Sequence, residues 1–508
     1  MIGLFIGVSS YLTAGIFSLV WDRFRFWFSA LGWAGALAGL VVSSINFNKS
    51  GVLIEYLGKW GILGIEIKVD FTTLLFAILV VVLNIFTLMY FRNKKSEKFC
   101  FLYNLLLATS FSMAFTHDLF NIYVTIELMS LISILLIGFD RHAYQIYAGI
   151  KYLILSSLGM SLYLIGLAMI YKEVGYLGVS KVASLIGDNP DFAVSIGLSL
   201  MISGLAVKGG VLMFGMWLPD AHSYSGTVVS ALLSGMAIKC GLIGMLRISS
   251  ISHIGSPLLL LGTLTGIGAG IFALFEKIPK RILAYSTISQ IGYILLAIGI
   301  GSSMELMAGS LHILFHGLYK SLMFLSVGHG NIGTADLSEE ASNRSVPIVS
   351  KVGFVIGALS IAAVPPFEGF FSKSLILDYA SPAWVWVMIL VISVITALVY
   401  IRLGRFVLKL RSVWELKKGG LSILIFSLVV AGGGLTSLFF TRGGWRVGPF
   451  CPAHLIESSG MLAIALVLYL IFKQYFQRIS LTEAPFSLDN SLISLFTGIL
   501  LMVMLLVL

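Results

Sequence analysis

The feature that most constrains this chain is its succession of apolar runs, each long enough to cross a bilayer as one helix. The run MIGLFIGVSSYLTAGIFSLV is typical, and it continues directly into further apolar sequence. About 20 apolar residues in a helix span the hydrocarbon core, whereas barrel strands would be alternating segments of about 10 residues. Only 11% of the residues are charged, against about 25% in soluble domains. The sequence therefore predicts an all-α polytopic membrane protein.

Turn residues and charge clusters divide the apolar sequence into sixteen expected spans. The segment 46–69 is expected to be an outer connection that is partly strand. The expected spans are 3–20, 27–45, 70–91, 101–116, 118–138, 145–171, 192–215, 224–248, 257–275, 282–301, 304–328, 349–379, 383–410, 420–440, 457–475 and 491–508.

The distribution of basic residues predicts the orientation. With the N-terminus outside, 21 of the 33 Lys and Arg residues fall on the cytoplasmic side and 8 on the outer side. Cytoplasmic loops carry the excess of basic residues, so we expect a multi-pass protein of the cell membrane with its N-terminus outside. The net charge of +10 then reflects the basic residues of these loops and does not indicate a nucleic-acid-binding protein. The remaining four basic residues lie inside expected spans, and they are Lys208, Lys239, Lys320 and Lys373.

Two of the expected spans contain proline interruptions. The seventh is broken near Pro219, and the twelfth at Pro365 and Pro366. If 101–248 and 257–411 are two five-helix units, each break falls in the fourth helix of its unit, and the second unit is inverted. Matched breaks in inverted repeats indicate an ion site near the midplane, although proline kinks are also common in membrane helices. The N-terminal helices then occupy 1–100, and the C-terminal helices occupy 412–508.

Ionisable residues inside membrane spans need an explanation, because burying a charge there costs free energy. A charged Lys at the bilayer centre costs about 2.5–3.5 kcal/mol. Glu127 is the natural counter-ion for Lys208, either as a proton-trading pair or as a static salt bridge. Lys239 has no acidic neighbour in sequence, so we expect a relay group; the alternative is that its stem snorkels to an interface.

His312, His316 and Lys320 are spaced four residues apart, which keeps them on nearly one helix face. Two His at i, i+4 could bind zinc, or both could be structural, but we favour a proton-transfer face because His titrates near neutral pH. Lys373 follows the second break as a candidate last relay group. The candidate gate or neighbouring groups are Glu368, Asp220 and His222.

Several motifs resemble the antiporter-like subunits shared by respiratory complex I, Mrp-type sodium/proton antiporters and energy-converting membrane-bound hydrogenases. They are HDLFNIYVTIELMSL with Glu127, WLPDAHS, VSALLSG, KCGLIGMLRI with Lys239, LAYSTISQIGYILLAIGIGS, HILFHGLYKSLMFLSVG and PPFEGFFSKSLIL with Lys373. The resemblance covers about 70–440 and is strongest to the shorter members. It implies about fourteen core transmembrane helices with inverted five-helix repeats, so the last two expected spans would be extra C-terminal helices. It implies a coupled pair (Glu127 and Lys208), a central relay (Lys239), a bridge (His312, His316 and Lys320) and an exit lysine (Lys373).

We therefore expect an ion-translocating membrane subunit of a multisubunit redox-driven or Mrp-type complex. It would move protons, or exchange Na⁺ for protons, along a central Glu/Lys/His axis. The three cysteines lack C-x-x-C spacing, so no iron–sulfur site is expected on this chain. Iron–sulfur or other redox centres, and any active site of a hydrogenase or complex I type translocase, are expected on partner membrane subunits. The alternatives are a structural subunit with a decayed channel and a stand-alone cation/proton antiporter.

Overall fold

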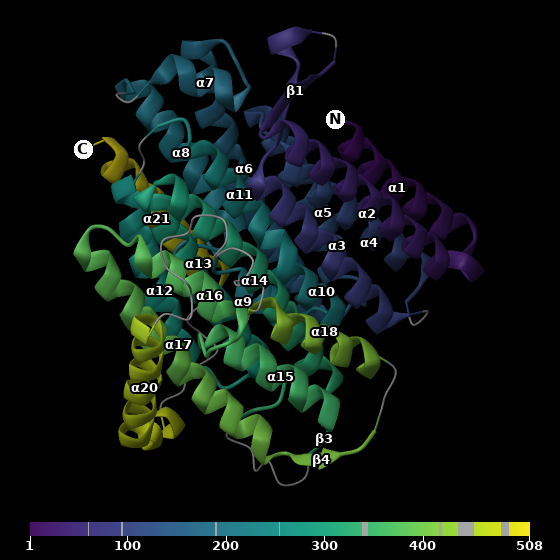
Figure 1. The fold of residues 1–508 in the computed structure, drawn as a ribbon, viewed down its shortest axis with the longest axis vertical. Helices are drawn as coiled ribbons and strands as arrows, with labels where there is room; N and C mark the ends of the chain where they lie inside the picture. The colour runs from purple at the N-terminus through teal and green to yellow at the C-terminus, as the bar shows by residue number, and fades with distance from the viewer. Residues whose placement is uncertain are drawn as a thin grey trace.

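In the computed structural model the chain is a bundle of helices (Figure 1). The structure describes residues 1–58, 60–92, 95–187, 190–252, 255–337, 344–415, 419–434, 452–478 and 487–507. Its helices are α1 Ile2–Val20, α2 Arg25–Ser50, α3 Phe71–Phe91, α4 Glu97–Phe115, α5 Leu119–Ile137, α6 Ala143–Val174, α7 Val179–Ile186, α8 Phe192–Gly209, α9 Leu218–Tyr224, α10 Thr227–Leu232, α11 Ile238–Ile248, α12 Gly255–Phe275, α13 Pro279–Ile300, α14 Ser303–His329, α15 Ile348–Ile361, α16 Glu368–Asp378, α17 Ala383–Lys409, α18 Gly420–Gly433, α20 Pro452–Arg478 and α21 Leu488–Val507.

Hydropathy confirms a multi-pass membrane protein. Among the described residues, 13 helices are long and apolar enough to cross a membrane, and α15 and α18 are shorter apolar helices. The helix α14 is long enough but is not one of the 13, because its His and Lys residues lower its mean hydropathy. Each expected span has a helical counterpart, and the two extra C-terminal helices are present as α20 and α21. The end of the expected span 420–440 lies outside the described residues.

Two small sheets accompany the helices. The strands β1 (Leu53–Leu57) and β2 (Ile65–Val69) form an antiparallel hairpin, with Leu53 opposite Val69. This confirms that the connection after α2 is partly strand. An isolated bridge between Ile67 and Thr116 ties the hairpin to the corner between α4 and α5. The strands β3 (Ser345–Pro347) and β4 (Arg411–Val413) pair in parallel.

The centre of the bundle is built from its most buried helices. In Figure 1, α1 and α2 lie at one edge, α17 and α20 lie toward the opposite edge, and α10, α13 and α14 lie between them. The span formed by α10, a π-helical turn (η3, Leu233–Ala237) and α11 is 100% buried, as is α13. A Cβ added at Gly235 in this turn would lie 2.0 Å from Ser321 Oγ on α14. The glycine lets the two helices approach closely, as small residues commonly do in membranes.

Both predicted helix breaks are present. The helix α8 ends at Gly209, where Gly210 adopts the left-handed conformation (φ +70°) that ends a helix at low cost. The expected span 192–215 was therefore too long. Pro219 does not break a helix but begins α9, because a proline is tolerated in the first turn, where its missing N–H is not needed. The second break lies between α15 and α16 and contains Pro365 and Pro366. The two-unit division and the inversion stay predictions.

The two C-terminal helices each contact one break. Ser458 on α20 donates its hydroxyl to the carbonyl of Ala363, between α15 and α16 (2.6 Å). Ser494 on α21 donates to the carbonyl of Met213, between α8 and α9 (2.8 Å). A carbonyl outside a helix and away from water needs such a partner. Each extra helix thus completes the hydrogen bonding of one interrupted span.

Candidate functional site

The first group of buried charges surrounds Lys208, in the last turn of α8. Its ammonium lies 3.1 Å from Glu127 Oε2 on α5. It also donates to the hydroxyls of Ser130 (2.7 Å) and Ser156. The predicted pairing of Glu127 with Lys208 is confirmed. Three oxygens from two helices satisfy the three N–H donors of one lysine, which offsets the cost of burying its charge.

Asp220 lies with a different lysine. Its carboxylate accepts a hydrogen bond from Lys151 Nζ (2.7 Å), and Arg281 lies 3.9 Å away. Lys151 was counted with the cytoplasmic loops and their flanks, and its side chain is only 1% exposed. Arg247 was counted with the outer connections, and it too is buried, in α11, where it bonds Asp70 (2.5 Å). Both residues lay inside expected spans, and these positions could have indicated that their side chains are buried.

His222 is buried at the end of α9, stacked on Phe324 of α14 with ring centroids 4.7 Å apart. It lies within electrostatic range of Lys239 and Lys320. Of the two candidate neighbours after Pro219, His222 therefore lies near the central lysines, whereas Asp220 belongs to the Lys151 pair.

Lys239 lies fully buried directly after the π-helical turn. Its ammonium donates to the backbone carbonyl of Ser234, within that turn. Among the described residues, no carboxylate lies within ion-pair distance of it. A π-helical turn leaves carbonyls without their usual i+4 partner, and such turns occur often at functional sites. Lys239 has no acidic neighbour in sequence, and a backbone carbonyl of the π-helical turn accepts its hydrogen bond instead.

The stripe on α14 is buried along its length, as its spacing predicted. The imidazole rings of His312 and His316 are stacked, with centroids 5.9 Å apart and planes 8° apart. His312 Nδ1 lies 2.9 Å from Ser372 Oγ on α16. Lys320 donates to the hydroxyls of Tyr400 (2.9 Å) and Ser286. Hydroxyl groups therefore connect the stripe on α14 to α13, α16 and α17. Sequence patterns could not identify these hydroxyls.

Lys373 closes the second break. Its ammonium donates to the carbonyl of Ile361, the last residue of α15 (2.6 Å), and lies 4.6 Å from the centre of the Tyr293 ring. Glu368, the first residue of α16, is fully buried, and neither carboxylate oxygen has a hydrogen-bond partner among the described residues. It forms no ion pair with Lys373 in that part of the chain.

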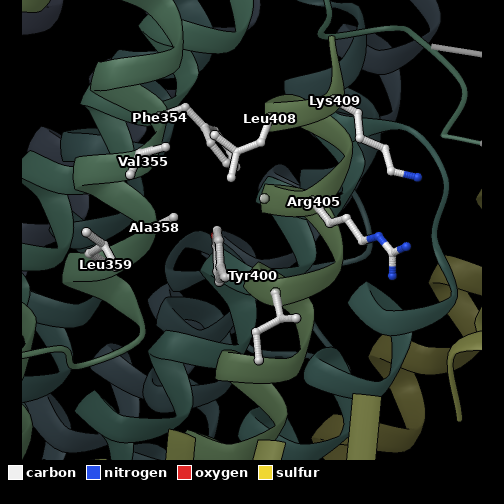
Figure 2. A pocket seen from close by; sticks show the side chains of 10 residues that line it. Phe354, Val355, Ala358, Leu359, Tyr400, Arg405, Leu408 and Lys409 are labelled. Atoms are coloured by element: carbon white, nitrogen blue, oxygen red, sulfur yellow. The ribbon is translucent and has the colours of Figure 1, made fainter. Parts of the chain in front are cut away.

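A pocket of about 500 Å³ lies between α15 and α17, and Tyr400, a hydrogen-bond partner of Lys320, is among the residues that line it. Figure 2 shows Tyr400 at the pocket together with Phe354 and Leu408, while Arg405 and Lys409 point away from α15. Because Tyr400 lines the pocket and its hydroxyl bonds Lys320, one side chain connects the pocket to the buried stripe.

Comparison with known proteins decides the family. The family profile described as NADH:quinone oxidoreductase/Mrp antiporter, TM, matches residues 116–399. These residues include every candidate site residue predicted from the sequence. The chain belongs to this family.

Two relatives and one solved structure illustrate the likeness. The chain is 32% identical to NADH-quinone oxidoreductase subunit N of Desulforudis audaxviator over 60% of this chain and 64% of that protein. It is 28% identical to a Na(+)/H(+) antiporter subunit of Alkalihalophilus pseudofirmus over 67% of this chain and 72% of that protein. It shares its fold with a chain of the archaeal membrane-bound sulfane sulfur reductase (TM-score 0.78, 24% identity, 91% of this chain and 99% of the other).

This antiporter-family chain also holds a charged group outside its spans, beside the β1–β2 hairpin. Glu66 on β2 is buried and accepts a hydrogen bond from Ser180 Oγ (2.6 Å), and burial raises the pKa of its carboxyl. His117 Nε2 lies 3.7 Å from Glu66, and burial, with the charge of Arg247, lowers the pKa of His117 to about 2. Asp70 precedes α3; burial alone would raise the pKa of its carboxyl, but the Arg247 guanidinium holds that pKa well below the usual range.

Proposed function

We propose that this chain is the proton-translocating membrane subunit of a multisubunit complex in the cell membrane, with its N-terminus outside. Protons would move along one line of groups through the centre of the bundle. The line comprises Glu127 and Lys208, then Lys239, then His312, His316 and Lys320, and finally Lys373. The observation that carries the proposal is the burial of three lysines, Lys239, Lys320 and Lys373, whose hydrogen-bond partners are hydroxyl and carbonyl oxygens.

The chemistry of these partners supports proton transfer. An ammonium buried without a counter-charge is expensive, so such a lysine favours release of its proton when the neighbouring charge changes. In the first group, the carboxylate of Glu127 can stabilise the charged form of Lys208. A weakening of that pair would free Lys208 to pass a proton on toward Lys239. The two stacked histidines can each accept and donate through either ring nitrogen.

Protons suit this line better than sodium ions do. Hard cations bind to carboxylate, carbonyl and water oxygens, whereas ammonium groups and protonated imidazoles have no lone pair to offer. If Na⁺ is exchanged, its site would lie elsewhere in the complex, and this chain would carry the proton. Partner subunits are proposed because both relatives are named as subunits. Redox centres would then belong to those partners.

The test is the variant Lys239→Ala in the assembled complex, purified from its host and reconstituted into lipid vesicles. We expect proton flux to fall by about 100-fold, a typical contribution of a proton-transfer group, with subunit composition unchanged. The control is Lys98→Ala, since Lys98 is exposed at the start of α4. Unchanged flux in Lys239→Ala would overturn the proposal and favour a structural subunit.

A further inference from the structure

The polar stripe of α14 extends further than its sequence spacing predicted. Glu305 lies seven residues before His312, which is two helical turns and therefore nearly the same face. The expected span began at 304, and Glu305 was not among the candidate site residues predicted from the sequence. In the structure Glu305 is fully buried, and it stands on the stripe that continues through His312 and His316.

A capping role does not explain this glutamate. Ser302 and Glu305 have the spacing of a capping box, in which the serine accepts from the third residue and the glutamate returns a bond to the cap. The first half is present, because Ser302 Oγ accepts from the backbone N–H of Glu305 (3.2 Å). The return bond is absent, since neither oxygen of Glu305 accepts a hydrogen bond from any described residue. The side chain is instead buried in the bundle, where a carboxyl group without a hydrogen-bond partner must either hold a proton or bind water.

The antiparallel packing of α14 and α16 brings a second carboxyl to the same level. His312 contacts Ser372, which fixes the register of the two helices. Glu305 lies about 10 Å beyond that contact along α14, and Asp378 about 9 Å beyond it along α16, in the same direction. Asp378 is accordingly close enough to act on Glu305 electrostatically.

The helix α20 adds an imidazole to this pair. His454 Nε2 lies 3.0 Å from Asp378 Oδ1, and its Nδ1 lies 3.3 Å from Glu457 Oε2. The exposed fraction of the side chains is 0% at Glu305, 17% at Asp378, 6% at His454 and 30% at Glu457. Titratable groups of three helices thus lie between the buried stripe and the partly exposed Glu457.

We propose that Glu305, Asp378 and His454 form the proton port of the second unit, on the side of the membrane that carries the N-terminus. The proposal rests on the proton translocation proposed above. The port uses α20, a helix beyond the fourteen expected core spans, and Ser458 holds that helix against the break beside Lys373. The outer connection of the channel is therefore supplied by the extra C-terminal segment.

Each transfer balances with water as the only co-reactant. In the outward direction an N–H bond of Lys373 or His312 breaks, the proton moves along hydrogen-bonded water, and an O–H bond forms on Glu305. That O–H bond then breaks, and the proton passes to Asp378, to a ring nitrogen of His454 or to surface water. Inward movement uses the same groups in reverse order.

The experiment compares Glu305→Gln, Glu305→Asp and Glu173→Gln in the reconstituted complex, with Lys239→Ala measured beside them. Glu173 is an exposed carboxylate at the end of α6, which the alternation of the spans places on the same side of the membrane. We expect proton flux to fall at least about tenfold in Glu305→Gln, to recover largely in Glu305→Asp and to stay normal in Glu173→Gln. A structural role would be met by the isosteric Gln as well as by Asp.

The outcomes separate the two proposals. Loss of flux in Lys239→Ala together with normal flux in Glu305→Gln overturns the port alone, whereas normal flux in Lys239→Ala overturns the translocation proposal itself. If Glu305→Gln does not assemble, the double variant Asp378→Asn, His454→Gln replaces it. At least about tenfold lower flux in that assembled variant supports the port, and normal flux overturns it.

Discussion

Lys208 and the other three lysines of the proposed line are held in different ways. Lys208, at the end of α8, lies against a carboxylate and two hydroxyls. Lys239, Lys320 and Lys373 bond hydroxyl and backbone carbonyl oxygens, with no carboxylate at ion-pair distance among the described residues. The surroundings of Lys208 can therefore hold its ammonium charged at little cost, whereas the other three ammonium groups are buried without a counter-charge, which makes their charged form more costly. Charge can reside at Lys208 and pass along the other three.

The largest effect should follow from breaking the ion pair of Lys208. Glu127→Gln leaves Lys208 buried without its counter-charge, and we expect a loss of about 3 kcal/mol in the free energy of unfolding. Lys373→Met leaves no carboxylate without its partner, so its loss should stay below about 1.5 kcal/mol. Denaturant unfolding of the purified complex, followed through this subunit, measures both. Equal losses would show that Lys208 and Lys373 are held alike.

The two helix breaks should also differ in their tolerance of a methyl group. A Cβ at Gly369, in α16, would lie 1.9 Å from the backbone carbonyl oxygen of Ser360. We expect Gly369→Ala to destabilise the protein by about 2 kcal/mol through this overlap. A Cβ at Gly209 would meet only the side chain of Leu242, at 3.2 Å, so Gly209→Ala should cost less than about 1 kcal/mol. Thermal unfolding of the two variants decides whether the second break is the tighter one.

A carboxylate placed beside Lys320 would make its surroundings resemble those of Lys208. In Ser286→Asp the new side chain replaces a hydroxyl that accepts from Lys320. The added charge should stabilise the ammonium, and a stabilisation of about 1.4 kcal/mol slows proton release about tenfold. Ser286→Asn has nearly the same shape without the charge and should keep most of the flux. Similar flux in both variants would contradict the view that proton passage needs an uncompensated lysine.

The last prediction concerns pH beside the β1–β2 hairpin. His117 has a folded-state pKa of about 2, below the ordinary value of about 6.5. The unfolded chain binds the proton first, so stability falls as the pH drops below about 6.5, by at most about 1.4 kcal/mol per unit. The raised pKa of Glu66 acts in the opposite direction. The stability advantage of the wild type over His117→Gln should therefore shrink with acidification, and a constant difference would contradict a neutral buried His117.

The helices of this fold could be predicted well because a membrane span is recognisable from its own residues. The same holds for the stripe of His312, His316 and Lys320, since residues four apart share a face in any helix. The Glu127–Lys208 pair could be predicted because Glu127 is the one carboxylate deep in an expected apolar span without a proline break beside it. These are properties of single helices or of simple charge balance.

The parts that were missed depend on how helices meet. Lys151 and Arg247 were counted with loops, because hydropathy gives the depth of a helix end only roughly and does not give its rotation. Their partners Asp220 and Asp70 lie far away in sequence. The turn that supplies the acceptor for Lys239 is π-helical, and its crossing with α14 at Gly235 is a tertiary contact. Ser130, Ser156, Ser286 and Ser372 carried no signal, because serine is common in membrane helices.

The contacts of Ser458 and Ser494 have a consequence for biosynthesis. Both residues belong to helices that leave the ribosome after the other described spans have been made. Until then the carbonyls of Ala363 and Met213 lack these hydroxyl donors, and the interrupted spans must find other partners in the translocon or in water. The nascent protein would hold two interrupted spans without these donors, and translation of α20 and then of α21 would supply them in turn.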